Sequence, residues 1–548
     1  MGETPVPRSG SSRGMTTARG RRTPRPDRTP RAVRAPRVVV TPRLVFVVAL
    51  LGLFLVSAAW SLASPLSSGP DESGHVAKAA ATVRGQFVGA PTDTPGITTF
   101  RLPADIGQVG GEMTCYVALP MTTASCAPAP ASLGHEVQTV KTGVGSYYPL
   151  YYAVVGWPSL IVGGSWSMLG MRLVSALVNS FFLALVLFAA ASLPRLRTLA
   201  GWFAVACTPM VFYLGGLVNP NGTEICATAA ATALGLLVLH DSRERPSAGR
   251  MALLAVSIAV AASMRSTSPV ILVIVLVAVC LTVPVARLVS VLRTRAVLVA
   301  IAATVVAILP AVVWTMSIAR DGGFIPSSDP ERAGVLAAAT HTFLDTGTFG
   351  KGMIGIFGWQ DTFAPEAVYA GWTIGLGIVV FGALAAGRRR AMLGALVLMA
   401  AVVLFPVALQ APTAHTFGYI WQGRYGLPVL VAMVLVAGFA AGSSSRGRTG
   451  GRAAAVLVGA AAVGQVLSFV AVYRRYSVGS MGSRGAMFSG DGWQAPGGVW
   501  TVGTMLVIGL VVLGAVVITI ASARRSPSPS QPALSPSQPA PSQPAVSE

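Results

Sequence analysis

Two adjacent carboxylates and a histidine one helical turn later are the residues of this chain best placed to do chemistry. Asp71, Glu72 and His75 follow the apolar run 44–62 and a short Ser/Pro/Gly bridge. A charge beside a bilayer is costly to hold, so such a pair needs a partner or a task. A carboxylate here can take a proton from a hydroxyl or help to hold a divalent cation such as Mg²⁺ or Mn²⁺.

The same three residues also fit a purely structural role. Residues 71–84 have the pattern of a short helix along the membrane surface, with Asp71 at its start. On such a helix Asp71 and His75 lie one turn apart, so their side chains can meet. Spacing alone leaves open whether the acids are catalytic residues, metal ligands, or a helix cap with solvated interfacial charges.

Aromatic and amide side chains recur where other apolar runs meet water. Tyr148 and Tyr152 suit either contact with a sugar or lipid chain or anchoring at the interface. Trp359 can stack on a sugar ring, although its loop is also typical of an ordinary interfacial segment. Asn219 opens a turn between two apolar runs, and Glu224 begins the second run, where it faces the bundle interior or caps the helix.

Three basic residues are candidate ligands for the phosphate of a lipid. Arg265 lies in a tight turn between two apolar runs, Lys351 in a long loop, and Arg424 at the start of a run. Snorkelling of a long side chain to the interface is the alternative explanation for the arginines. His415 and Tyr425 belong to the same loop as Arg424 and are grouped with it as candidate substrate contacts.

The elements that must position these residues are membrane spans. The 548 residues are 53% hydrophobic and only 11% charged, whereas soluble proteins average about 25% charged. Runs of about 20 apolar residues predict an all-α polytopic membrane protein. The twelve predicted spans are 44–63, 168–193, 200–218, 221–240, 250–264, 269–287, 296–318, 368–386, 391–410, 426–442, 453–472 and 499–521.

The distribution of charge decides whether a thirteenth apolar segment, 147–163, crosses the membrane. If it does not cross, the loops that hold most of the arginines all fall on the side of the N-terminus. If it crosses, every one of them lands outside, against the positive-inside rule. We therefore predict a re-entrant or interfacial helix there, with both termini cytoplasmic and long external segments at 64–167 and 319–367.

The two ends of the chain are not expected to carry chemistry. Residues 1–43 contain 11 arginines with little apolar content, and residues 522–548 are rich in Pro, Ser and Gln. Both predict disordered cytoplasmic segments flanking a transmembrane domain at 44–521. In the first external loop, Cys115 and Cys126 form a plausible disulfide if that loop meets an oxidising compartment.

Several enzyme and binding classes are excluded. The net charge of +21 comes from the leader and from short loops between spans, which is a topology signal and not a nucleic-acid surface. The chain has no P-loop, GxGxxG, HExxH, CxxC cluster or nucleophile elbow. Its short cytoplasmic loops cannot form a nucleotide-binding domain.

Several motifs together resemble a bacterial family known as domain of unknown function 2142. They are Pro70-Asp71-Glu72 with His75, Tyr148-Pro149-Leu150-Tyr151-Tyr152, Asn219-Pro220-Asn221, Gly358-Trp359 and Gln422-Gly423-Arg424-Tyr425. That family is similar to the GT-C glycosyltransferases. These are polytopic enzymes with a polyprenyl-phosphate sugar donor and an acidic motif after the first span that acts as base or metal ligand.

The resemblance implies a glycosyltransferase of the bacterial plasma membrane with its site on the extracytoplasmic side. Its partners would be a polyprenyl-phosphate-linked sugar and a cell-envelope glycan or lipid acceptor. Asp71 and Glu72 match the acidic motif by position, whereas the phosphate ligands follow from topology alone. A divalent cation is compatible with the two acids but not required by them. A transporter or flippase for lipid-linked precursors, and a polysaccharide polymerase or ligase, are the alternatives.

Overall fold

The computed structural model describes residues 41–107, 111–128, 134–242, 246–318, 334–386, 388–442, 448–490 and 492–523. Nearly all of both predicted terminal segments lies outside the described residues, as do residues 319–333 of the second long external loop. Within the described ranges the chain is mainly helical, with five short strands.

Nine helices in these ranges are long and apolar enough to cross a membrane. Each coincides with a predicted span, so the all-α multi-pass class is confirmed. They are α1 (Pro42–Leu62), α5 (Gly164–Ser192), α8 (Pro220–His240), α12 (Arg295–Ser317), α15 (Glu366–Ala385), α16 (Arg389–Gln410), α18 (Leu427–Ala441, entered through the 3₁₀ turn η6, Gly423–Gly426), α19 (Arg448–Val478) and α20 (Gly498–Ser522).

The other three predicted spans are shorter or bent. Helices α6 (Thr198–Ala206) and α7 (Pro209–Gly215) meet at a bend of 80°, and α10 (Ser268–Leu281) and α11 (Val285–Leu292) at 116°. Proline begins α7 and precedes α11 because it cannot donate a helical hydrogen bond. Helix α9 (Ala248–Ala262) has 15 residues. By length, the described helices give nine spans, or up to eleven if each bent pair is one span.

The segment 147–163 does not form a spanning helix. It contains α4 (Leu150–Gly156) and the 3₁₀ turn η4 (Trp157–Leu160). Seven helical residues extend only about 10 Å, far less than the hydrocarbon core of about 30 Å. The short helix packs against α2 (Glu72–Thr82) and α5, which agrees with the re-entrant or interfacial alternative.

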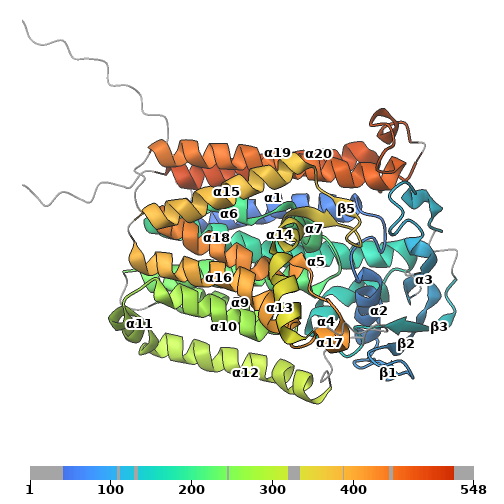
Figure 1. The fold of residues 1–548 in the computed structure, drawn as a ribbon, viewed down its shortest axis with the longest axis horizontal. Helices are drawn as coiled ribbons and strands as arrows, with labels where there is room; N and C mark the ends of the chain where they lie inside the picture. The colour runs from blue at the N-terminus through green and yellow to red at the C-terminus, as the bar shows by residue number, and fades with distance from the viewer. Residues whose placement is uncertain are drawn as a thin grey trace, which may run out of the picture. The chain divides into compact units, whose positions relative to one another are not determined.

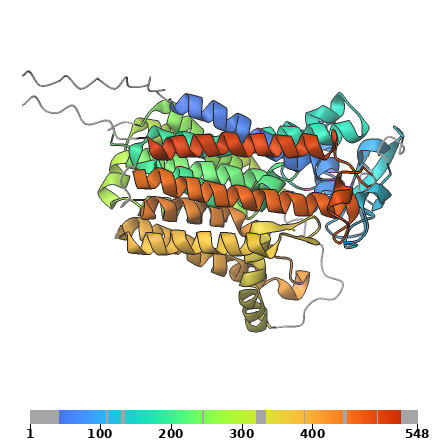
Figure 2. The same ribbon diagram turned by 90° about the horizontal axis from the view of Figure 1, so that it is seen from above.

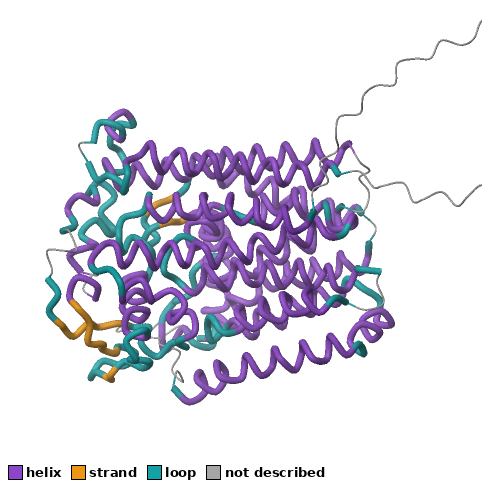
Figure 3. The backbone as a smooth tube through the Cα atoms, turned by 180° about the vertical axis from the view of Figure 1, so that it is seen from behind, coloured by secondary structure: helices purple, strands orange, loops and turns teal. Residues whose placement is uncertain are grey.

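Strands and short helices gather at the end of the bundle that holds α2, at the right in Figure 1 and among the loops in Figure 3. Strand β2 (Thr98–Pro103) pairs antiparallel with β1 (Ala90–Pro91) and β3 (Val137–Thr142), next to α3 (Ala104–Gly107). The 3₁₀ turns η1 (Gly111–Thr114) and η2 (Ala124–Cys126) flank a disulfide between Cys115 and Cys126, which confirms that pairing.

The described parts of the segments 334–365, 411–426 and 479–497 add to the same end. They contain α13 (Val335–Leu344), α14 (Thr346–Gly355), the hairpin β4 (Ile356–Phe357) with β5 (Thr362–Phe363), α17 (Ala414–Phe417), and the 3₁₀ turn η7 (Gly485–Met487). At the opposite end lies α11, with the short connections between spans (Figure 1). Chemistry-bearing loops and short connections are thus separated by the length of the bundle.

Packing fixes which helices frame the acidic motif. The first span, α1, lies against both α5 and the last span, α20 (Figure 2). Helix α8 is the innermost, because its apolar stretch is wholly buried by neighbouring elements. Proline at its first position and Asn219 as its N-cap, which accepts from the Asn221 amide at 3.0 Å, define where it begins.

Candidate functional site

The two acids of the motif are held by different arginines. Glu72 is fully buried and forms a two-pronged ion pair with Arg172 of α5, at 2.7 and 2.6 Å. Its two oxygens also accept the amides of Val218 and Gly69, at 3.1 and 3.3 Å. Both oxygens of Glu72 are therefore committed to the fold, and the site is left with Asp71 as its exposed acid.

Arg172 is a residue that our sequence reasoning missed. Besides Glu72, its guanidinium donates to the carbonyls of Ser61, Ser64 and Pro65 in the bridge that follows α1. This one side chain therefore fixes the segment that leads into Asp71. A usable signal was present in the sequence, since an arginine inside an apolar span is rare and marks a specific partner.

Asp71, unlike Glu72, is only partly buried. Its side chain is half exposed, and Oδ2 accepts from Arg424 Nη2 at 2.7 Å. The backbone of Asp71 has φ +61°, a left-handed conformation that few residues other than Gly, Asn and Asp adopt readily. Its side chain makes no cap bond to α2, so the helix-cap alternative does not account for it.

A second guanidinium completes the polar side of this site. Arg265 stacks on the ring of Tyr425 with its Cζ 4.0 Å from the centroid, and Arg424 lies 4.9 Å from the same centroid. Asp71 is close enough to act on Arg265 electrostatically. The structure thus brings together Asp71, Arg265, Arg424 and Tyr425, from three distant parts of the sequence.

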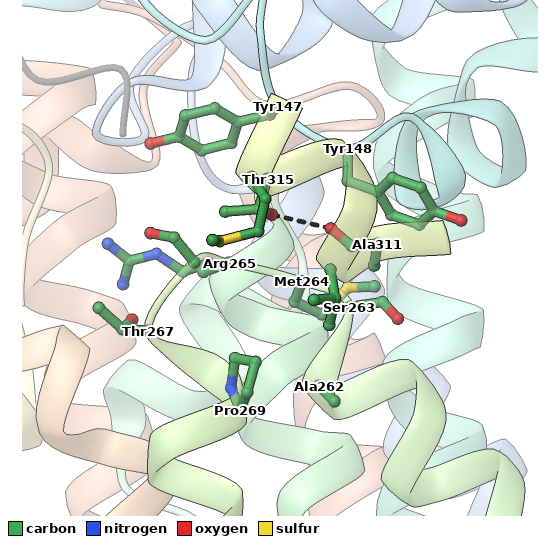
Figure 4. Close-up of a pocket in the computed structure, with 13 residues that line it drawn as sticks. Tyr147, Tyr148, Ala262, Ser263, Met264, Arg265, Thr267, Pro269, Ala311 and Thr315 are labelled. Atoms are coloured by element: carbon green, nitrogen blue, oxygen red, sulfur yellow. Dashed lines mark hydrogen bonds between the residues drawn. The ribbon is translucent and has the colours of Figure 1, made fainter. Parts of the chain in front are cut away.

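An apolar cavity of about 230 Å³ adjoins this cluster. It lies between the turn that follows α9, the last turns of α12, and the loop that carries Tyr147 and Tyr148. Figure 4 shows the Arg265 guanidinium on the side where the Tyr147 hydroxyl lies, away from Tyr148. The cavity therefore has one charged side and a wall of aliphatic and aromatic groups.

His75 faces inward and pairs with a tyrosine. Its Nδ1 lies 2.9 Å from the hydroxyl of Tyr152, and the two rings stack. Burial, assisted by Arg424 and Arg265, lowers the His75 pKa from 6.5 to about 4, although Asp71 opposes the shift. The imidazole is neutral at pH 7, and its described side-chain hydrogen bond goes to Tyr152 and not to Asp71, the partner that helical spacing allowed.

This depressed pKa predicts a stability change with pH. Because the unfolded chain binds the proton more readily, stability is fully present above about pH 6.5 and is lost as the pH falls toward 4. We expect His75→Asn, which keeps a polar atom near Tyr152 but does not titrate, to flatten this part of the curve. Unfolding midpoints of both proteins between pH 7 and 4 measure it; parallel curves would contradict the assignment.

The remaining predicted residues are spread around the cluster. Asn219 donates from Nδ2 to the carbonyl of Pro70 at 3.2 Å and so supports the acidic motif from α8. Trp359 donates to the Ser67 carbonyl at 3.0 Å. Lys351 pairs with the exposed Glu366 at 3.3 Å, and His415 is exposed on α17. No described contact joins Lys351 or His415 to Asp71.

Two glycines bring α14 against the loop that carries Arg424. A Cβ on Gly423 would overlap the carbonyl oxygen of Phe349 and lie 2.8 Å from the Cα of Gly352. Both obstacles are backbone, so the loop would have to shift. Gly350, on the same helix, has open space where its Cβ would be.

This contact predicts a matched pair of effects. We expect Gly423→Ala to displace Arg424 and to cost about 1–3 kcal/mol of stability, as overpacking does. Gly350→Ala should behave like wild type. Thermal unfolding of the two purified variants tests the contact. Equal behaviour of the two variants would show that the loop adapts without consequence.

Comparison with known proteins places the chain in a family. The model described as "Predicted membrane protein (DUF2142)" matches residues 54–433. The chain belongs to the DUF2142 family. The resemblance stated from the sequence motifs is thereby confirmed, and the matched region of this DUF2142 protein includes Asp71, Arg265 and Arg424. No curated protein sequence matches the chain.

Two solved structures resemble the chain at low identity. They are crystal structures of ArnT from Cupriavidus metallidurans, one bound to undecaprenyl phosphate and one in the apo state. The first is 14% identical with a TM-score of 0.43 and covers 87% of this chain and 77% of ArnT. The second is 15% identical with a TM-score of 0.43 and covers 86% and 77%. Similarity at this level gives no residue-by-residue correspondence.

Proposed function

We propose that this protein is a membrane glycosyltransferase that moves a sugar from a polyprenyl-phosphate donor to a cell-envelope glycan or lipid acceptor on the extracytoplasmic side. One observation carries the proposal: a half-exposed carboxylate, Asp71, lies with the buried guanidinium of Arg424 and the partly buried guanidinium of Arg265 beside an apolar cavity. A base, an anion site and a lipid-lined wall are the parts that such a transfer requires.

Each part has a step in the reaction. Asp71 takes the proton of an acceptor hydroxyl, whose oxygen attacks the anomeric carbon while the bond from that carbon to the phosphate oxygen breaks. Arg265 and Arg424 stabilise the negative charge that remains on the lipid phosphate. A single displacement inverts the configuration at the sugar. The isoprenoid chain lies along the cavity walled by α12.

The ion pair between Asp71 and Arg424 links donor binding to catalysis. In the structure the carboxylate and the guanidinium satisfy one another at 2.7 Å. A donor phosphate that takes over Arg424 releases Asp71 to accept a proton. Glu72 acts as a positioning residue through Arg172, and no second carboxylate faces Asp71 as a partner in the described contacts.

Topology supports the outer side for this site. Helix α11, which contains Arg287 and is followed by Arg293, lies at the end of the bundle opposite α2, the helix that follows Asp71. Positive loops stay in the cytoplasm. The buried charged side chains within the described helices α5, α8 and α19 are Arg172, Glu224 and Arg475. Each lies near the Asp71 end of its helix and has a hydrogen-bonding partner, so they do not line a path through the membrane as a transporter would need.

Binding of undecaprenyl phosphate to the purified protein in nanodiscs tests the proposal. We expect Arg265→Gln to weaken binding about 10- to 100-fold, because a charge-assisted hydrogen bond contributes about 1.5–3 kcal/mol. Lys351→Gln is the control, since Lys351 of α14 pairs with the exposed Glu366 that begins α15 and has no described contact with Asp71. Native mass spectrometry measures both. If wild type does not bind the lipid, or if only the Lys351 variant loses it, the proposed donor site is wrong.

A further inference from the structure

Three residues of the loop that carries Arg424 each have a buried side-chain atom without a hydrogen-bonding partner. They are Nε1 of Trp421, Oε1 of Gln422 and Nε of Arg424. Buried polar atoms in folded proteins are nearly always satisfied, so each exception needs an explanation such as a ligand or water. The side chain of Arg424 is only 5% exposed, and its Nη2 already donates a hydrogen bond to Asp71.

A poorly formed loop is not the explanation. Gln410 accepts the backbone N–H of Trp421 at 2.8 Å and donates to the carbonyl of Gly418 at 2.6 Å. The N–H of Tyr425 is bonded to the carbonyl of Gln422 at 3.0 Å. The backbone is therefore fixed at both ends of the loop, and the three side-chain atoms named above are what lack a hydrogen-bonding partner.

The chemistry of the three atoms narrows the ligand. Nε1 of Trp421 and Nε of Arg424 are donors, whereas Oε1 of Gln422 is an acceptor. Oxygens of an ionised phosphate only accept, so a phosphate alone leaves Gln422 unsatisfied. Hydroxyl groups donate and accept, and a sugar ring carries several of them. Aromatic rings belong to the same loop, since Trp421 packs edge-on against Tyr425 with centroids 5.6 Å apart.

We propose that Trp421, Gln422 and Arg424 form a subsite that binds the hydroxyl groups of a sugar ring beside Asp71. Our sequence analysis gave the role of sugar-stacking residue to Trp359, whose indole N–H is taken by the Ser67 carbonyl. Trp421 has its N–H free for a ligand. That this sugar is a reactant of the transfer rests on the proposed function. Binding of the sugar ring by these residues does not depend on it.

Saturation-transfer NMR with a panel of methyl hexopyranosides and methyl pentofuranosides tests the subsite on the full chain in nanodiscs. We expect at least one glycoside to bind wild type. Trp421→Phe, which removes the indole N–H together with the five-membered ring, and Gln422→Leu, which removes the side-chain amide, should each weaken that binding about 5- to 100-fold, as loss of a buried hydrogen bond does. Trp500→Phe is the control, because Trp500 is 72% exposed and stacks on Phe488.

Binding of undecaprenyl phosphate, measured in parallel, separates this inference from the proposed function. Variants that lose the glycoside but keep the lipid are folded and support the subsite. If no glycoside binds wild type, or if both variants bind it as wild type does, the subsite is overturned even where the lipid binds. If glycosides bind as expected and the lipid does not, the donor proposal fails and the subsite stands. Should Trp421→Phe fail to fold, Gln422→Leu decides alone.

Discussion

Replacing Asp71 with asparagine is expected to lower the rate of sugar transfer about 100- to 10,000-fold, the contribution typical of a general base. The substitution is well matched, because asparagine also tolerates the left-handed backbone that Asp71 adopts with φ +61°. It removes only the charge. Arg424 then loses its ionic partner, so affinity for undecaprenyl phosphate should be retained or increased.

Envelope linkage analysis provides the readout for this variant. A deletion strain is complemented with wild type, Asp71→Asn or Glu366→Gln, and the glycan linkages and protein levels are compared. Glu366→Gln is the control, since that acid is exposed and pairs only with Lys351 in the described contacts. Full restoration by an expressed Asp71→Asn protein would mean that Asp71 is not the base, and would favour the transporter alternative.

The second large effect concerns the fold. Replacing Glu72 with glutamine, or Arg172 with methionine, should destabilise the protein by about 3–5 kcal/mol, because each change leaves an uncompensated buried charge. For Arg172→Met the carbonyls of Ser61, Ser64 and Pro65 also lose their donor. We expect lower thermal midpoints and less folded protein after extraction, whatever the activity of the remainder.

A double-mutant cycle shows whether the pair acts as a unit. The combined variant should be more stable than the sum of the two single losses predicts, because neither charge is then left alone. Lys351→Met with Glu366→Gln is the matched control on an exposed pair, where about 0–1 kcal/mol is expected. Additive losses at Glu72 and Arg172 would argue that their contact at 2.6 Å is not the source of stability.

Local patterns in the sequence were sufficient for the spans and for the short helix after the first span. Apolar runs of fixed length define α1 or α20 without reference to any partner, and the helix predicted at 71–84 is observed as α2, although most of its residues are buried. The bends were harder, because Pro209 and Pro284 lie inside or beside apolar runs that length alone reads as continuous. Hydropathy reports how apolar a run is and not its direction, so it does not show where the helix bends.

The different environments of the two acids in the motif could not be predicted from the sequence. Asp71 and Glu72 are adjacent, yet the first is half exposed and the second wholly buried, because each turns toward an arginine from a different part of the chain. The same limit applies to Trp359 and Trp421. Both are tryptophans of loops between spans, and they differ in that the indole of Trp359 donates to the Ser67 carbonyl whereas that of Trp421 has no hydrogen-bonding partner.

The buried pair of Glu72 and Arg172 also has a consequence for how the protein is made. The two residues are 100 positions apart, and synthesis at about 5–20 residues per second separates their emergence by about 5–20 s. During that interval Glu72 has no counter-charge and must stay hydrated beside the inserted α1. The loop that follows α1 can therefore fold only after α5, with Arg172, has been synthesised. In a nascent chain arrested before residue 172, we expect this loop to be cleaved by protease.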